Sequence, residues 1–112
     1  MKVSFEGIGE LVATFYNNGA SDGDPVKPTD NGEVSPCAAG DKFIGVAAAP
    51  GAQYTGVIIR GFAVLPYTGA APALGMTALS ANGSGGVKAD DSGCVYPVVA
   101  VDKGEKTVCI IL

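Results

Sequence analysis

The feature that most constrains the fold is a correspondence between the two halves of the chain, at an offset of 51 to 53 residues. Turn glycines and apolar runs recur together at this offset. The matched segments are Gly23 with Gly75, Asn31-Gly32 with Asn82-Gly83, Val34 with Val87, Gly40 with Gly93, 43–47 with 96–100, Gly51 with Gly104, and 57–59 with 108–110. Such self-similarity is typical of a duplicated structural unit. It predicts two repeats of about 52 residues, at 23–60 and 75–111, and the alternative is chance matching in a chain rich in Gly, Val and Ala.

The spacing of glycine and proline predicts an all-β fold. The chain of 112 residues contains 17 Gly and 7 Pro, which interrupt almost every window long enough for a helix. The runs between them are rich in β-branched residues, as strands are. We place strands at 11–16, 25–28, 33–38, 43–49, 54–65, 76–80, 86–88, 95–101 and 106–112. The expected fold is a single domain over residues 1–112, a small β-barrel or sandwich built from two duplicated, hairpin-rich repeats.

Each repeat is expected to form two successive hairpins. Asn31-Gly32 and Asn82-Gly83 lie between predicted strands, and Asn-Gly favours the type I′ turn, in which both central residues have positive φ. Gly56 and Gly61 fall inside the longest predicted strand, 54–65, and indicate bends or bulges in it.

The charge pattern argues against several classes of partner. The formal net charge is −4, and the seven basic residues occur singly, so the basic patch of a nucleic-acid-binding protein is missing. No apolar run approaches the roughly 20 residues of a membrane helix. The N-terminal sequence lacks the apolar core of a secretory signal. We therefore expect a soluble protein made in the cytoplasm, with no nucleic-acid or membrane partner.

The residues that usually carry catalysis or bind metals are scarce. The chain has no His, and its three cysteines, Cys37, Cys94 and Cys109, are far apart, so we predict free thiols and no zinc site, Cys-His pair or Ser-His-Asp triad. The acids of Asp22-Gly23-Asp24 and Asp90-Asp91 lie in Gly/Ser-rich stretches and are interpreted as turn residues. We predict no catalytic residue, no metal ligand and no cofactor.

Two segments are predicted to make contacts with other chains. In residues 1–10, Val3 and Phe5 alternate with polar residues and precede Gly7-Ile8-Gly9, so Val3, Phe5 and Ile8 are candidates for an arm that adds a strand to another protein's sheet. The alternative is an ordinary first strand of this domain's own sheet. In the 54–65 strand, one face presents the candidate self-association residues, which are Ile58, Arg60, Phe62 and Val64.

A family resemblance rests on two stretches and their continuation. Residues 39–47 read Gly-Asp, apolar residues and Gly-Val-Ala, and 56–66 form a β-rich run that contains Gly61 and ends in Leu-Pro. A similar pattern of glycine, apolar strand and Asn-Gly turn continues in Pro72-Ala73-Leu74-Gly75, Leu79, Asn82-Gly83 and Gly86-Val87. Over residues 23–112 the chain resembles small all-β phage proteins assigned to capsid decoration, also called head-stabilising or cement proteins. Residues 1–16 match no pattern of that family.

The resemblance implies a structural protein of a phage or prophage, made in the bacterial cytoplasm and located in the virion capsid. Its expected partners are the major capsid protein and further copies of itself, as a homotrimer, and no catalytic residues are implied. A thin core, with four Phe, four Tyr and no Trp, also favours oligomerisation. Two alternatives are a small β-barrel binding module for a glycan or peptide, with Tyr54 and Tyr67 as its aromatic platform, and a small enzyme that uses carboxylates alone.

Overall fold

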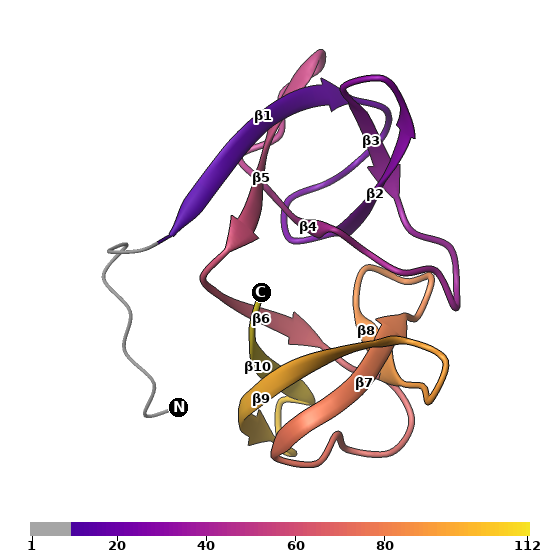
Figure 1. Cartoon of the computed structure of the whole chain (residues 1–112), viewed down its shortest axis with the longest axis vertical. Coiled ribbons are helices and arrows are strands. Elements are labelled where there is room, and N and C mark those ends of the chain that lie inside the picture. Colours follow the sequence, from indigo (N-terminus) through magenta and orange to yellow (C-terminus); the bar gives the residue numbers. More distant parts are fainter. Residues whose placement is uncertain (1–9) are drawn as a thin grey trace.

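The computed structural model describes residues 10–112, which form ten strands and no helix. The strands make two five-stranded sheets, one from each half of the chain, with the first above the second in Figure 1. The first sheet contains β1 (Leu11–Asn17), β2 (Pro25–Asp30), β3 (Glu33–Pro36), β4 (Gly45–Ala48) and β5 (Tyr54–Arg60). The second contains β6 (Phe62–Pro66), β7 (Gly75–Ala81), β8 (Val87–Ala89), β9 (Cys94–Asp102) and β10 (Thr107–Ile111).

The first sheet closes into a barrel with the order β1-β3-β2-β4-β5. β5 returns to pair with β1 in antiparallel fashion, and β1 pairs with β3 in parallel at Tyr16 and Asn17. The barrel interior is small, because the residues that fill it are mostly Val and Ala: Ala20, Val26, Val34, Ala47 and Val57, with Phe15 and Ile59 packed against them.

The second sheet has the order β6-β10-β9-β7-β8. Its outer strands β6 and β8 meet only at a parallel bridge between Tyr67 and Val87. Its core contains the largest fully buried side chains, Leu65, Leu79 and Ile110. The predicted all-β class, with a small closed barrel, is therefore confirmed.

The two halves share one strand order. If β6–β10 are matched in turn to β1–β5, the second sheet reads β1-β5-β4-β2-β3, which is the barrel order of the first sheet followed in the other direction. Equivalent backbone hydrogen bonds accompany it: Asn18 N–H donates to Val34 and Thr68 N–H to Val87, at 2.9 and 3.1 Å. A shared strand order is what a duplication requires. Duplication itself stays a prediction, which superposition of 23–59 on 75–110 tests.

The predicted strands fall within two residues of the observed bounds, with one exception. The predicted 54–65 strand was wrong as a single strand, because the chain turns at Gly61 and continues as β6 in the other sheet. Gly61 has φ +120°, and a Cβ there would lie 3.4 Å from Cα of Glu10. A residue with a side chain is disfavoured at such a φ. The glycine therefore separates the two sheets.

The predicted hairpins are confirmed, but their turn type is not. β2 pairs with β3, β4 with β5, β7 with β8, and β9 with β10, all antiparallel. In the β2–β3 turn Gly32 has φ +68°, whereas Asn31 does not have positive φ. Type I′ requires positive φ at both positions. A register shift between Pro28 and Asp30 accompanies this turn, so the prediction from Asn-Gly alone was wrong here.

The two halves are joined by the connection between β3 and β4. Gly40 N–H donates to the Ala81 carbonyl at 2.8 Å, and Ala81 N–H donates to the Asp41 carbonyl at 3.0 Å. Phe43 stacks on Tyr96 with ring centroids 4.9 Å apart, and the Tyr96 hydroxyl donates to the Phe43 carbonyl. Phe43, Cys37 and Val46 thus enter the core of the second sheet although they come from the first half.

An ion pair between Lys27 and Asp41 holds this connection against β2. The hydrogen bond from Lys27 and the one from the Ala38 N–H lower the pKa of Asp41, and the same pair raises the pKa of Lys27. A carboxylate with a lowered pKa stabilises the fold above its unfolded pKa of about 3.9, and this contribution is lost as the pH falls through the folded value. Both side chains are about one third exposed (34% and 32%), so solvent screens the pair.

We expect Asp41→Asn to lower the midpoint of thermal unfolding at pH 7, because the ionised carboxylate is lost. The difference from the wild type should shrink as the pH falls below about 3.9, where the wild-type carboxylate also becomes protonated. Calorimetric scans from pH 2.5 to pH 7 measure this. Asp91→Asn, at an exposed turn position, is the control and should follow the wild type at every pH. A difference that persists undiminished at low pH would contradict the assignment.

Candidate interaction surface

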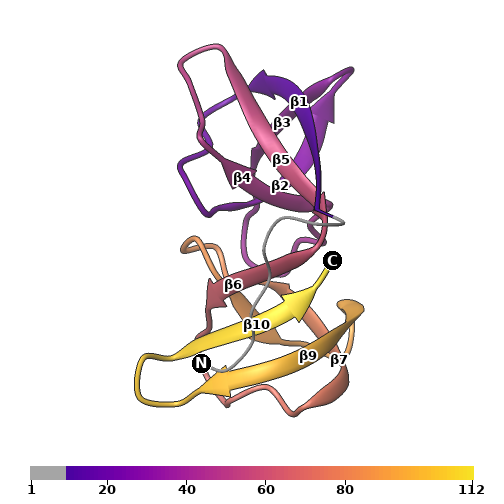
Figure 2. The ribbon, with the colours of Figure 1, turned by 90° about the vertical axis from the view of Figure 1, so that its left-hand side faces the viewer.

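The outward side of β6, β10 and β9 carries almost only apolar side chains. Cross-strand pairing places Phe62 beside Ile111, Val64 beside Cys109, and Cys109 beside Ala100. Val99 is the extra residue of a bulge in β9 next to this row. Val64, Val99 and Ile111 are 57%, 37% and 36% exposed. We call these six residues the apolar face, and Figure 2 shows its three strands at the front of the molecule.

The apolar face has no charged side chain within it, and two charges flank it. Arg60, the last residue of β5, is exposed and precedes the Phe62 end. Asp102, the last residue of β9, lies beside Thr107 at the opposite end. The Asp102 Oδ1 accepts the N–H groups of Gly104 and Glu105 at 3.0 and 3.1 Å, which fixes the β9–β10 turn.

The predicted self-association residues all have outward positions, on two strands instead of one. Ile58 and Arg60 belong to β5, and Phe62 and Val64 belong to β6. Ile58 and Phe62 are partly buried, and Arg60 and Val64 are exposed. Arg60 has no ion pair within residues 10–112. Arg60 is therefore a candidate for pairing with a carboxylate of another copy, in line with its selection as a self-association residue.

The sequence analysis missed the contributions of β9 and β10 to the same surface. Val99, Ala100, Cys109 and Ile111 join Phe62 and Val64 only because β10 lies between β6 and β9. The alternation of Val108, Ile110 and Leu112 with Cys109 and Ile111 was visible in the sequence. Which of the two sets faces outward was not, since both are apolar.

β1 has an open edge over part of its length. It pairs with β5 from Leu11 to Tyr16, but with β3 only at Tyr16 and Asn17. The Tyr16 N–H donates to the Gly32 carbonyl on the β3 side, at 2.8 Å. Because these groups alternate along a strand, those of Val12 and Thr14 point to the same side, where no strand of residues 10–112 pairs with them. An uncharged open edge such as this can accept an added strand.

Of the two tyrosines predicted to form an aromatic platform, only one is exposed. Tyr54 is 48% exposed, but Tyr67 is only 5% exposed, because it closes the second sheet against Val87. Tyr67 therefore cannot form a platform. Tyr16, which the sequence analysis did not select, stacks on Tyr54 at a centroid distance of 5.0 Å and is 49% exposed. The two rings meet because Tyr16 on β1 lies opposite Tyr54 on β5. This pairing between distant strands could not be predicted from the sequence.

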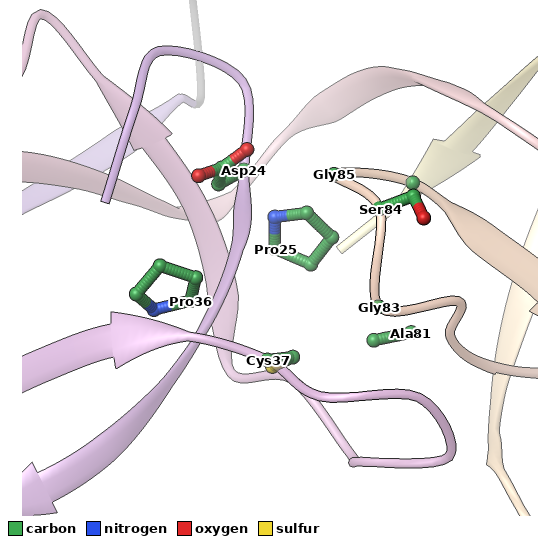
Figure 3. A pocket seen from close by; sticks show the side chains of 9 residues that line it. Asp24, Pro25, Pro36, Cys37, Ala81, Gly83, Ser84 and Gly85 are labelled. Atoms are coloured by element: carbon green, nitrogen blue, oxygen red, sulfur yellow. The ribbon is translucent and has the colours of Figure 1, made fainter. Parts of the chain in front are cut away.

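A pocket of about 250 Å³ lies where the two halves meet, between the ends of β2 and β3 and the β7–β8 turn (Figure 3). Its lining includes the Asp24 carboxylate, the Cys37 thiol and the backbone of 83–86. Burial, and then the nearby Asp41 carboxylate, raise the pKa of Cys37 to about 11. The thiol is therefore protonated at neutral pH and is not an activated nucleophile.

Two of the predicted turn acids, Asp24 and Asp90, accept hydrogen bonds from N–H groups of their own turns. Asp24 accepts the Ser21 N–H at 2.9 Å, and Asp90 accepts the Ser92 N–H at 2.9 Å and the Ser80 hydroxyl at 2.8 Å. These bonds from Ser80 and Ser92 lower the pKa of Asp90. Within residues 10–112 no group of three or more Cys, Asp and Glu side chains is placed to hold a metal ion. The three cysteines are free thiols, as predicted.

The candidate arm residues Val3, Phe5 and Ile8 lie outside the described residues, so their role stays a prediction. Residues 10–112 contain no helix long and apolar enough to span a membrane. Comparisons with protein-family models, with curated proteins and with solved structures found no match to this chain.

Proposed function

We propose that this chain is a non-enzymatic structural protein that decorates and stabilises the head shell of a phage or prophage. The observation that carries the proposal is the apolar face, an uncharged surface over three adjacent strands on which Val64, Val99 and Ile111 are exposed. Surfaces of this kind mark protein–protein contacts. The sequence resemblance to capsid decoration proteins supplies the class of partner, the major capsid protein.

The fold suits a protein whose work is to bury surface between neighbours. A typical specific contact buries about 800 Å² on each partner. Many copies on one shell strengthen it together even when each contact is modest. The body offers the apolar face for self-association, for which the resemblance implies a trimer. It also offers the open edge of β1, and the candidate arm at residues 1–10 is the proposed contact with the shell.

The test is binding to shells assembled without this protein. We expect saturable co-sedimentation with undecorated shells of the source phage or prophage, and a rise in the temperature at which the shells release their contents. The matched control is a sample of the same shells already saturated with the protein, to which no further protein should bind. No co-sedimentation at tens of micromolar protein would contradict the proposal.

A second candidate function is a binding module for a glycan, favoured by the exposed Tyr16–Tyr54 pair. Sugars stack on exposed aromatic rings, but here each ring already covers one face of the other. Fluorescence titration with an array of oligosaccharides separates the two functions. Saturable binding that is lost in Tyr54→Ala, without shell binding, would favour the module.

A further inference from the structure

The apolar face is best matched by another copy of itself. The chain carries a net charge of −4, so two copies repel each other wherever their carboxylates meet. On the apolar face no carboxylate meets another, because the face has no charged side chain within it. A second copy can therefore cover Val64, Val99 and Ile111 without desolvating an unpaired charge.

The charges that flank the face are opposite in sign and lie at opposite margins. Arg60 adjoins the β6 margin, and Asp102 ends β9 at the other. Arg60 has no ion pair within the described range. Both hydrogen bonds found for the Asp102 side chain are accepted by Oδ1, and neither by Oδ2. Lys103, Glu105 and Lys106 follow Asp102 in the exposed turn, beyond the strand. Each copy thus carries one cation, Arg60, and one carboxylate, Asp102, that can form ion pairs with neighbouring copies.

The apolar face covers only part of one side of the molecule. That side, seen in Figure 2, measures 35 by 22 Å and also includes strands of the first sheet. An interface of about 800 Å² per partner would therefore also involve residues around the face. A contact between two different margins is head-to-tail, and repeated head-to-tail contacts form a ring such as a trimer when the rotation between copies closes.

We infer that copies of this chain associate through the apolar face, with the β6 margin of one copy against the β9 margin of the next and Arg60 paired with Asp102 across the contact. This inference deepens the self-association part of the proposed function. It is tested on the free protein without shells, so its failure is distinguishable from failure of shell binding.

The first test introduces a charge into the face and into a matched position outside it. Val64→Glu should raise the dissociation constant at least about 100-fold, because an unpaired carboxylate would be buried in the contact. Ile44→Glu is the control: Ile44 is also an exposed apolar residue, at 41%, and lies in the connection between β3 and β4, outside β6, β9 and β10. Sedimentation equilibrium from 1 to 100 µM measures both, and circular dichroism confirms that both variants are folded.

The second test is a double-mutant cycle at the two margins. Arg60→Gln and Asp102→Asn should each raise the dissociation constant roughly two- to five-fold, as exposed ion pairs do, and the double variant should bind no more weakly than the weaker single variant. The amide of Asn keeps an oxygen for the N–H groups of the β9–β10 turn. A wild type that stays at the monomer mass of 11.1 kDa at 100 µM, or equal losses in Val64→Glu and Ile44→Glu, would overturn the inference. If the factors by which the two single substitutions raise the dissociation constant multiply in the double variant, the Arg60–Asp102 pairing is overturned.

Discussion

Deletion of residues 1–9 should abolish co-sedimentation with undecorated shells while leaving the midpoint of thermal unfolding nearly unchanged. Within residues 10–112, both core clusters are formed by residues from Phe15 onward, and the predicted arm lies before them in the sequence. In that segment Val3 and Phe5 alternate with polar residues, as in a strand that pairs with a sheet edge and inserts alternate side chains into pockets.

Two double variants test whether shell binding needs the apolar side chains of the segment or only the presence of the segment. Val3→Ser with Phe5→Ser should lose shell binding as the deletion does, because the side chains that enter the pockets are removed. Lys2→Ala with Ser4→Ala changes the alternate positions of the same segment and should retain binding. Sedimentation of shells with bound protein, quantified on gels, measures the three variants together with the wild type.

The opposite pattern would place residues 1–9 in the domain's own sheet. Loss of several degrees in the unfolding midpoint, with binding retained, would show that the segment supports the fold. The shell contact would then lie elsewhere, and the loop at 66–74 is the next candidate. Its Leu74 is 69% exposed and lies beside a second pocket, of about 360 Å³.

Phe43→Ala should lower the free energy of unfolding by about 3 to 5 kcal/mol, the usual cost of removing a buried aromatic side chain. Phe43 is only 4% exposed and stacks on Tyr96, so the substitution removes a contact between the two halves as well as filled volume. Small domains have about 5 to 15 kcal/mol in total, so this is a large fraction. Urea unfolding, followed by circular dichroism, measures the shift in midpoint.

Ile44→Ala is the matched control for Phe43→Ala, because it changes the next residue of the same connection. Ile44 is 41% exposed, so its truncation should cost much less. The wild type should unfold in one transition, since the second core includes residues of the first half. Two separate transitions, or equal losses in both variants, would show that Phe43 does not couple the halves.

Local signals were enough to place the strands. Glycines and prolines mark the turns, and β-branched runs mark the strands between them, and both act over a few residues. The assignment of strands to sheets depends on non-local pairing. The run from Tyr54 to Leu65 has apolar residues on both faces, with Thr55 and Arg60 as its polar exceptions. Gly61 indicated a bend or bulge within one strand, but its local pattern does not show that the chain passes there from one sheet to the other.

The same physical limit explains which parts of the candidate surface were found. Phe62 and Val64 could be selected from one strand, but Val99 and Ile111 reach them only through the order β6-β10-β9. Tyr67 was selected as an exposed aromatic, yet its bridge to Val87 buries it. Exposure at these positions is decided by which strands become neighbours, and single-strand alternation contains no information about that.

Phe43 belongs to the first half of the chain but packs in the core of the second sheet, and this limits where the polypeptide can be divided. A cut at Gly61 would separate the two sheets cleanly in the backbone, since β5 ends at Arg60 and β6 starts at Phe62. The fragment 1–60 would then expose Phe43, and the fragment 61–112 would leave Tyr96 without its stacking partner. Neither fragment is a self-sufficient module, so the two would be obligate complements, each completing the other only on reassembly.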